Sequence, residues 1–315
     1  MTEQHRERAG DPRANALVIG ESLIDIVEHV GGDTADRDHS TTEHVGGSPA
    51  NVAIGLARLD HPVRLLTSIG SDARGRTIAE ALEGEGVALL PQSWGDRPTS
   101  TAHARIAADG SAEYAFDIDW RLGTGDHGPA DLVHTGSIAL FLEPGGAQVL
   151  GLLEELSGTA LVTLDPNIRP ALLGDRDGAV RRFERAAAMA DLVKLSDEDA
   201  AWLYPHDSPE EVAQRVRGLG PEVVVVTLGG DGALAAAPGG IVRVAARAVV
   251  VVDTISAGDS FMAAIASSLL EMGLDQVVAR LPEVLERAAR AAAIAVSAAG
   301  ANPPTRRRLD GETAD

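Results

Sequence analysis

The sequence predicts an α/β fold of three layers, in which helices cover both faces of a mainly parallel central sheet. Short apolar runs typical of buried strands alternate with helical segments along most of the 315 residues. Such alternation favours a parallel sheet, because parallel strands need crossover connections that are usually helices. The length allows one large domain or two small ones, and the absence of an internal repeat or low-complexity linker favours one.

Six apolar runs predict the strands of the central sheet, because strands covered on both faces carry apolar side chains throughout. These runs are residues 16–20, 63–69, 132–135, 160–164, 191–195 and 222–227. Helices are expected to begin near Pro49, with Ser48 as cap, and near Ser196, and to span residues 75–82, 147–156, 261–272 and 283–297. Val249–Val252 has a strand's composition and is expected to lead into the helix near Phe261.

Several shorter segments are also expected to be extended. Residues 23–27 continue from the first strand, and residues 101–106 and 112–116 favour a hairpin with its turn at Asp109-Gly110. A second hairpin is expected at residues 233–237 and 241–244. The polar residues 1–14 and 305–315 are expected to be disordered tails.

Composition excludes several classes of protein and of site. The formal net charge of −20 argues against nucleic acid as a partner. The absence of cysteine excludes disulfides, cysteine-based zinc sites and thiol catalysis. The N-terminus does not resemble a signal peptide, and no uninterrupted apolar stretch is long enough to span a bilayer. We therefore expect a soluble cytoplasmic protein with no membrane partner.

The single lysine narrows the chemistry further. Of the 27 basic residues only Lys194 is a lysine, and it follows Val193. A Walker A loop needs a lysine after glycine, so the chain is not a P-loop kinase. The lysine motif of protein kinases is absent, and Gly20 does not begin the glycine series that binds dinucleotides.

The stretch from Asp253 to Phe261 carries the strongest indication of chemistry. A strand-like run, a turn of small residues and a helix together point backbone N–H groups at an anion. Ser256 is expected to cap the helix in a capping-box arrangement with Asp259. The helix N-terminus would favour ionised Asp259, which suits taking a proton from a hydroxyl that attacks a phosphoryl group. A capped helix start with an ordinary aspartate would explain the same residues.

This stretch resembles the second signature of the ribokinase-like (PfkB) carbohydrate kinase family. The first signature also appears, at residues 46–53, with the sequence Gly-Gly-Ser-Pro-Ala-Asn-Val-Ala. Five shorter family-like pieces occur in the family's order, at residues 20–25, 69–72, 165–169, 194–198 and 227–232. The resemblance covers roughly residues 15–304 and is closest to the fructokinase branch.

The resemblance implies one ribokinase-like domain over residues 15–304, with a small β-sheet lid over the sugar formed by about residues 28–45 and 96–120. It implies that Asp259 is the catalytic base and that Ser256, Ala257 and Gly258 surround the transferring phosphoryl group. The implied sugar-binding residues are Asp25, Gly46, Gly47, Asn51, Arg105, Arg169 and Asp259. For Arg169, a surface ion pair is the alternative role.

The implied ATP-binding residues are Lys194, Thr227, Gly229, Gly232, Gly258 and Asn302. The family commonly has Asn-x-x-Glu at a water-mediated magnesium site, where this chain has Ser196 and Asp199 with Glu198 adjacent. Magnesium keeps several of its waters, so either carboxylate fits an outer-shell role, and both stay open. The backbone of Asp253 and Ile255 is expected to hold a monovalent cation such as potassium.

The expected activity is ATP-dependent phosphorylation of a sugar hydroxyl, with fructose as the first choice of substrate. Ribose and 2-keto-3-deoxygluconate are alternative substrates, and a non-catalytic sugar- or nucleotide-binding regulator is the alternative of another class. The 3% share of aromatic residues disfavours a nucleoside kinase. Because a lid of exposed strands has unpaired edges, we expect a homodimer that pairs through the lid.

Overall fold

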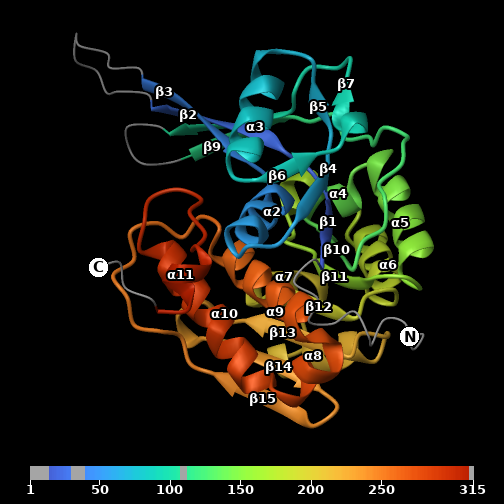
Figure 1. The fold of residues 1–315 in the computed structure, drawn as a ribbon, viewed down its shortest axis with the longest axis vertical. Helices are drawn as coiled ribbons and strands as arrows, with labels where there is room; N and C mark the ends of the chain where they lie inside the picture. The colour runs from blue at the N-terminus through green and yellow to red at the C-terminus, as the bar shows by residue number, and fades with distance from the viewer. Residues whose placement is uncertain (1–13, 30–39, 107–111, 312–315) are drawn as a thin grey trace.

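The computed structural model describes residues 14–29, 40–106 and 112–311. Its centre is a nine-stranded sheet with the strand order β15-β14-β13-β12-β11-β10-β1-β4-β6 (Figure 1). Neighbours pair in parallel from β13 to β6, whereas β14 and β15 add antiparallel strands at one edge. The strands are β1 (Ala16–Ile19), β4 (Val63–Leu66), β6 (Val87–Leu89), β10 (Leu132–Gly136), β11 (Leu161–Asp165), β12 (Leu192–Ser196), β13 (Val223–Thr227), β14 (Ala233–Ala237) and β15 (Gly240–Val244).

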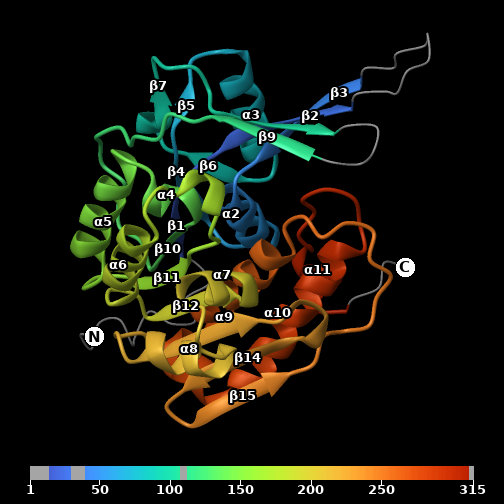
Figure 2. The same ribbon diagram turned by 180° about the vertical axis from the view of Figure 1, so that it is seen from behind.

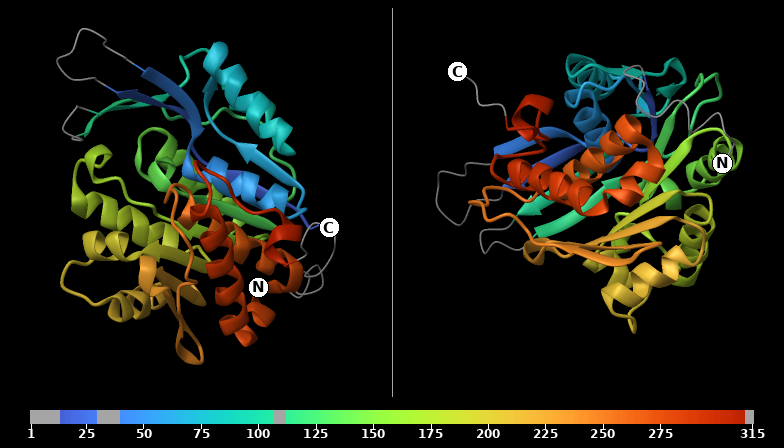
Figure 3. Two further views of the ribbon diagram at one scale, coloured as in Figure 1. Left: turned by 90° about the vertical axis from the view of Figure 1, so that its left-hand side faces the viewer. Right: turned by 60° about the horizontal axis from the view of Figure 1, so that its bottom comes forward.

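Helices cover both faces of this sheet (Figures 2 and 3). One face packs against α2 (Ser48–Arg58), α3 (Ala73–Gly84), α9 (Ala257–Ala279) and α10 (Leu281–Val296). The other packs against α4 (Ser137–Phe141), α5 (Gly145–Leu156), α6 (Arg176–Ala187), α7 (Asp197–Leu203) and α8 (Pro209–Arg217). Short 3₁₀ turns are η1 (Pro91–Ser93), η2 (Pro170–Leu172) and η3 (Gly229–Asp231).

Alternate side chains of each central strand enter two different cores. In β1, Ala16 and Val18 lie in the core beneath α2 and α9, whereas Leu17 and Ile19 lie in the core beneath α4 and α5. A strand buried on both faces needs apolar residues at every position, which is why these strands appear as continuous runs in the sequence. The predicted three-layer α/β fold is confirmed.

A second, four-stranded sheet projects from the body beside α3 (Figures 1 and 2). Its order is β3-β2-β8-β9, built from β2 (Leu23–His29), β3 (Ser40–Gly46), β8 (Thr101–Ile106) and β9 (Ala112–Asp117). These strands include the extended segments expected to form a lid, while the expected turn at Asp109-Gly110 lies outside the described residues. A two-stranded sheet joins β5 (Ile69–Gly70) to β7 (Trp94–Gly95).

The strand expected at Val249–Val252 is wrong. This segment has no regular structure, and all four valines are exposed, Val250 by 82%. The amides of Val252 and Asp253 donate to the carbonyl oxygen of Val296, at 2.8 and 3.2 Å. The segment is therefore hydrogen-bonded to the last residue of α10 and not to a neighbouring strand. The edge strand on this side of the sheet is β15. A β-branched composition favours a strand only where a neighbouring strand is available for pairing.

Helix α9 runs beneath the sheet as the central helix of its layer. It begins at Ala257 and is interrupted at Gly273, where the expected helix ends and φ is 75°. Helix α9 is long and apolar enough to cross a membrane, but 72% of its most apolar part is buried inside the protein. A buried core helix accounts for that composition.

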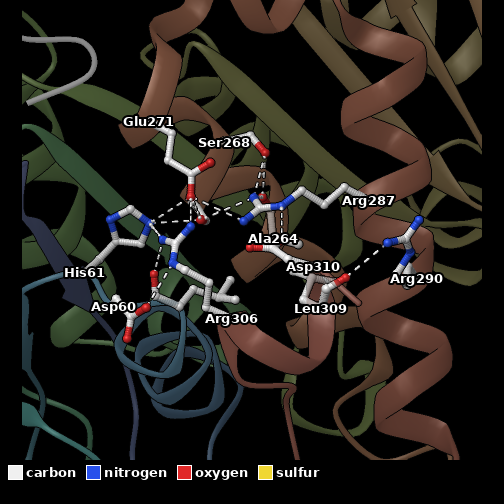
Figure 4. A network of polar contacts seen from close by, with 12 residues as sticks. Asp60, His61, Ala264, Ser268, Glu271, Arg287, Arg290, Arg306, Leu309 and Asp310 are labelled. Atoms are coloured by element: carbon white, nitrogen blue, oxygen red, sulfur yellow. Dashed lines mark hydrogen bonds and ion pairs between the residues drawn. The ribbon is translucent and has the colours of Figure 1, made fainter. Parts of the chain in front are cut away.

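The tail expected from residue 305 onward is wrong over its described part. Residues Arg306–Leu309 form the helix α11, and the Leu309 side chain is buried. Arg306 donates to Glu271 of α9 at 2.6 Å and pairs with Asp60 at 3.0 Å (Figure 4). A buried side chain and two ion pairs outweigh the polar composition from which a tail was expected.

Candidate active site

Asp259 lies where the two signature stretches meet. Its Oδ1 accepts a hydrogen bond from the Ser48 hydroxyl at 2.6 Å, and its Oδ2 accepts one from Asn51 Nδ2 at 2.8 Å. Ser48 and Asn51 stand in the first turn of α2, more than two hundred residues away in sequence. The fold therefore holds both oxygens of this buried carboxylate in fixed positions at the N-terminus of α9.

Burial, and not the helix end, dominates the electrostatics of Asp259. Loss of water raises the pKa of this carboxyl, and its hydrogen bonds from Ser48 and Asn51 and the charge of Lys194 offset the rise only in part. The helix N-terminus, which is expected to favour the ionised form, therefore does not keep the pKa of Asp259 at its ordinary value. A carboxylate with a raised pKa is a stronger base towards a hydroxyl proton.

The expected caps of both signature helices are also wrong. Ser256 has left-handed backbone angles, φ 60° and ψ 12°, and its side chain makes no capping hydrogen bond. An N-cap side chain reaches the first amides from extended backbone, so this geometry turns the hydroxyl away from them. The buried Ser256 Oγ has no hydrogen-bond partner among the described residues. In α2 the N-cap is Gly47, and Ser48 serves Asp259.

Lys194 places a positive charge beside the start of α9. Its ammonium donates to Asp165 Oδ2 at 2.9 Å, and both side chains are buried. Burial opposes protonation of Lys194, but the negative charges of Asp165, Asp199 and Asp259 outweigh it and raise its pKa. A Cβ on Gly258 would lie 2.9 Å from Lys194 Nζ, so the start of the helix lies close against the ammonium.

The first amides of α9 add donors to this positive region. Ala257 N donates to Thr254 O and Ser260 N donates to Ser256 O, at 3.3 and 2.9 Å. The amides of Gly258 and Asp259 lie between these two bonds, in the turn where a helix offers its amides no internal acceptor. Together with the Lys194 ammonium, they suit an anion such as a phosphoryl group.

Glu198 and Asp199 are the two carboxylates expected near magnesium, and they differ in exposure and in hydrogen bonding. Asp199 is buried, its Oδ1 accepts from Ile168 N at 2.7 Å, and its Oδ2 accepts from Ser196 N at 2.9 Å. Ser196 and Asp199 form a capping box for α7, so the Asp199 carboxylate is already engaged in hydrogen bonds that stabilise the start of this helix. Glu198 is exposed. Among residues 14–29, 40–106 and 112–311, no group of three or more potential ligands is preassembled for a metal.

The expected sugar end of the site gathers around Asp25. A Cβ on Gly46 would lie 2.0 Å from Asp25 Oδ2, and one on Gly47 would lie 2.4 Å from the Glu21 carbonyl. Burial raises the pKa of Asp25, while the charges of His44 and Arg169 lower it. Arg169 therefore lies within electrostatic reach of Asp25, although it comes from the loop after β11.

Arg105 does not join this group. The strand register pairs Asp25 with Ala102 and Glu28 with Arg105, so Asp25 and Arg105 point to opposite faces of the small sheet. Glu43, paired with Ile26, lies on the face of Arg105 and forms an ion pair with Arg74 of α3. The expectation of Arg105 as a sugar ligand fails, because sequence spacing without the register cannot give the face.

Most of the expected nucleotide residues lie near the carboxyl ends of the sheet strands and after α10, while Lys194 lies in β12 and Gly258 in α9. Thr227 ends β13, Gly229 begins η3, and Gly232 follows η3 in the turn to β14. The space around a Cβ on Gly229 is open to 4 Å, whereas the backbone of Gly232 abuts Val244. Asn302 Oδ1 accepts from Arg58 Nη1 at 2.6 Å, so this side chain is held towards α2.

The Asp253 side chain connects the segment that precedes α9 to the loop that follows α10. Its Oδ1 accepts from Ile255 N at 3.0 Å, and its Oδ2 accepts from Gly300 N at 2.9 Å. These backbone hydrogen bonds lower the pKa of its carboxyl. The side chain of Asp253 thus connects the segment before α9 to the loop after α10.

Two features of the site were not assigned from the sequence. Ser48 was expected only to cap its helix, and Glu21, which lies in the family-like piece at residues 20–25, had no expected role. Glu21 is buried directly after β1, and its Oε2 accepts from Ala139 N at 3.2 Å. A carboxylate at the carboxyl end of a buried parallel strand is a signal that would have marked Glu21 as a candidate.

Comparison with known proteins decides the family. The model of the pfkB family carbohydrate kinases matches residues 13–308. The chain belongs to this family. The predicted family is confirmed, and with it the prediction of a carbohydrate kinase.

Relatives of this pfkB chain include proteins of named activity. The chain is 33% identical over 263 residues to a fructokinase of Rhizobium leguminosarum bv. trifolii, covering 80% of this chain and 79% of that protein. A fructokinase from Vibrio cholerae O395, solved in a form bound to fructose, ADP and calcium ion, superposes with TM-score 0.77 and 25% identity, over 92% and 95% of the two chains. A sugar kinase from Pyrococcus horikoshii in complex with ATP gives TM-score 0.76 and 26% identity, over 94% and 98%.

Proposed function

We propose that this pfkB kinase is an ATP-dependent fructokinase. The observation that carries the proposal is the buried Asp259 carboxylate, anchored by Ser48 and Asn51 at a helix start that also presents the Lys194 ammonium. Two of the relatives above are named fructokinases, one of them with fructose and ADP bound.

In the proposed reaction, Asp259 accepts the proton of a primary sugar hydroxyl, with O6 of fructose among the candidates. The new bond joins that oxygen to the γ-phosphorus, and the bond from this phosphorus to the bridging oxygen breaks, which releases ADP. The amides of Gly258 and Asp259 and the ammonium of Lys194 stabilise the charge that develops on the transferring group. Ala257 and Ser256 complete the turn that aims these amides.

The residues of the site fit an outer-shell magnesium. Glu198 is the exposed carboxylate, and Asp199 is held by two backbone amides, so the protein offers one carboxylate that reaches the metal through water. Glu198 would hold magnesium through water, and the bound ion would neutralise negative charge on the phosphates. We further propose that carbonyl oxygens of Asp253 and Ile255 bind potassium, since the Asp253 side chain already orders that loop.

We place the nucleotide between the Thr227–Gly232 loop and the loop closed by Asp253. Thr227, Gly229, Gly232 and Gly258 meet ATP through their backbone, and Asn302 acts through its fixed position beside Arg58. The small sheet acts as the lid, with Asp25 on its inner face, and within the described part of the chain its outer strands β3 and β9 have one unpaired edge each. Covering those edges with a second copy supports a homodimer in the cytoplasm.

The test is coupled ADP release with Mg-ATP and potassium, against fructose, ribose, 2-keto-3-deoxygluconate, tagatose, glucose and adenosine. The proposal expects the highest kcat/KM with fructose. A different sugar clearly ahead would move the substrate but keep the kinase. ATP binding in a thermal-shift assay without turnover of any sugar would favour a sugar- or nucleotide-binding regulator on this fold. Light scattering that gives a monomer at micromolar concentration would refute the dimer.

A further inference from the structure

Helices α2 and α9 pack against each other, and hydrogen bonds between them hold Asp259. Asn51, in the first turn of α2, donates to Asp259, in the first turn of α9. One turn further along both helices, Gly55 of α2 faces Ala263 of α9. Residues four apart share one face of a helix, so the two pairs lie along one interface between helices that run in the same direction.

The contact at Gly55 leaves no room for a side chain. A Cβ on Gly55 would lie 2.6 Å from the Ala263 Cβ, and both residues are buried. Carbon atoms in contact lie about 3.5–4.0 Å apart, so an added methyl group would push the two helices apart by roughly 1 Å. The next neighbour of that Cβ is Pro303, at 3.6 Å, which is an ordinary contact. The crowding therefore comes from the Ala263 methyl group.

The end of this helix pair that lies away from Asp259 is tied by three polar contacts (Figure 4). They join His61 to Ser267 at 2.8 Å, Arg306 to Glu271 at 2.6 Å, and Arg306 to the Leu59 carbonyl oxygen. Because this end cannot open freely, a methyl group added at Gly55 acts mainly on the end that holds Asp259. A hydrogen bond of 2.8 Å that lengthens by about 1 Å is lost.

We propose that Gly55 is a positioning residue for the base, because the absence of a side chain there lets α2 bring Ser48 and Asn51 within hydrogen-bond distance of Asp259. The inference rests on the proposed function, in which Asp259 is the base. Gly55 acts only through the spacing of the two helices. A misplacement of about 1 Å can cost on the order of 100-fold in rate, so a single methyl group at this position should impair catalysis.

The pH dependence of turnover separates loss of position from loss of fold. The two side-chain hydrogen bonds to Asp259 lower its pKa, so their loss raises it. The charges that face Asp259 from the sheet, on Lys194 of β12 and Asp165 of β11, stay unchanged. The base acts only when ionised, so the acid limb of kcat/KM should move to higher pH in Gly55→Ala. A protein that is only less folded keeps the natural limb, and circular dichroism at each pH measures the folded fraction.

The experiment compares Gly55→Ala with the swap Gly55→Ala/Ala263→Gly, which moves one methyl group from α9 to α2. In the swap the added Cβ meets nothing closer than Pro303, at 3.6 Å. We expect Gly55→Ala to lower kcat by about 10–100-fold with KM for ATP unchanged, and the swap to restore kcat and the acid limb to those of Ala263→Gly alone. Gly151→Ala is the matched control, because Gly151 of α5 has open space around its Cβ, and it should keep natural turnover.

A crystal structure of Gly55→Ala tests the spacing without turnover. Asn51 Nδ2 and Asp259 Oδ2 should lie more than about 3.5 Å apart, against 2.8 Å in the natural chain. If Gly55→Ala does not fold, Ala263→Ser adds a smaller group at the same contact and should move the acid limb in the same direction. An unchanged distance, a natural acid limb or a swap that fails to recover would overturn the inference. If the natural chain phosphorylates no sugar but the distance lengthens, the proposed function fails and the spacing argument stands.

Discussion

The buried pair of Lys194 and Asp165 allows stability and catalysis to be separated. Their side chains are 5% and 1% exposed, and Nζ lies 2.9 Å from Oδ2. Replacing Lys194 with methionine leaves Asp165 buried without its partner, beside the carboxyl groups of Asp199 and Asp259. Breaking a buried ion pair in this way costs about 3–5 kcal/mol of folding free energy. We therefore expect Lys194→Met to lower the urea midpoint strongly.

The double variant Lys194→Met/Asp165→Leu should recover at least about half of that loss, because apolar residues of similar volume often replace a buried ion pair at little cost. Turnover should not recover. The ammonium beside Gly258 is still missing, and loss of one preorganised group at a transferring phosphoryl typically costs about 10²–10³ in kcat. Urea denaturation and coupled ADP release on both variants check the two halves.

The exposed ion pair of Arg74 and Glu43 serves as the control for the stability measurement. Its side chains are 41% and 44% exposed, so Arg74→Met should cost less than about 1 kcal/mol. A Lys194→Met protein that unfolds at the natural midpoint would refute the burial argument. A double variant with recovered stability and natural turnover would refute the assignment of Lys194 to the phosphoryl group.

Three further outcomes follow from the site and from the C-terminal contacts. Asp259→Asn should reduce turnover to below a few percent while ATP still binds, because an amide cannot accept the hydroxyl proton; retained turnover in the coupled assay would sink the assignment of the base. Asp25→Asn should raise KM for the sugar, whereas Arg105→Ala should leave it nearly unchanged, since Arg105 points to the opposite face; equal effects on KM would contradict that register. Glu271 is partly buried, yet hydrogen bonds and charges from His61, Arg287, Arg306 and Ser267 outweigh burial and lower its pKa to about 2 (Figure 4). A carboxyl whose pKa is lower in the folded state stabilises the protein above its ordinary pKa of 4.5, and this contribution is lost as pH falls towards 2. Glu271→Gln should therefore destabilise the protein at pH 7 by on the order of 2–3 kcal/mol and flatten its acid denaturation between pH 5 and pH 2; a natural acid profile in the variant would count against the network.

The sequence by itself determined the layered fold and the family. Strands such as β1 and β13 are covered on both faces, so nearly all of their residues are apolar. Such a continuous apolar run can be recognised in the sequence without knowing which elements pack against it. Gly47 and Gly258 were recognisable because they stand in the two signatures, while the neighbours that crowd them, Glu21 and Lys194, come from other elements. Asp259 and Asn51 belong to the two signatures, and the pfkB match confirms the family that these signatures indicate.

Only the tertiary structure decided what each polar side chain contacts. Ser48 donates a hydrogen bond to Asp259, and Asp199 accepts hydrogen bonds from the amides of Ser196 and Ile168. Arg105 lies on the opposite face of the small sheet from Asp25. In each case the partner lies on another element, or one step of strand register reverses the face, and local composition contains neither fact. The valines before α9 show the same limit, because a strand needs an edge to pair with and that edge is supplied by the rest of the sheet. Residue type thus determined which groups this protein has for its chemistry, and packing determined which of them meet.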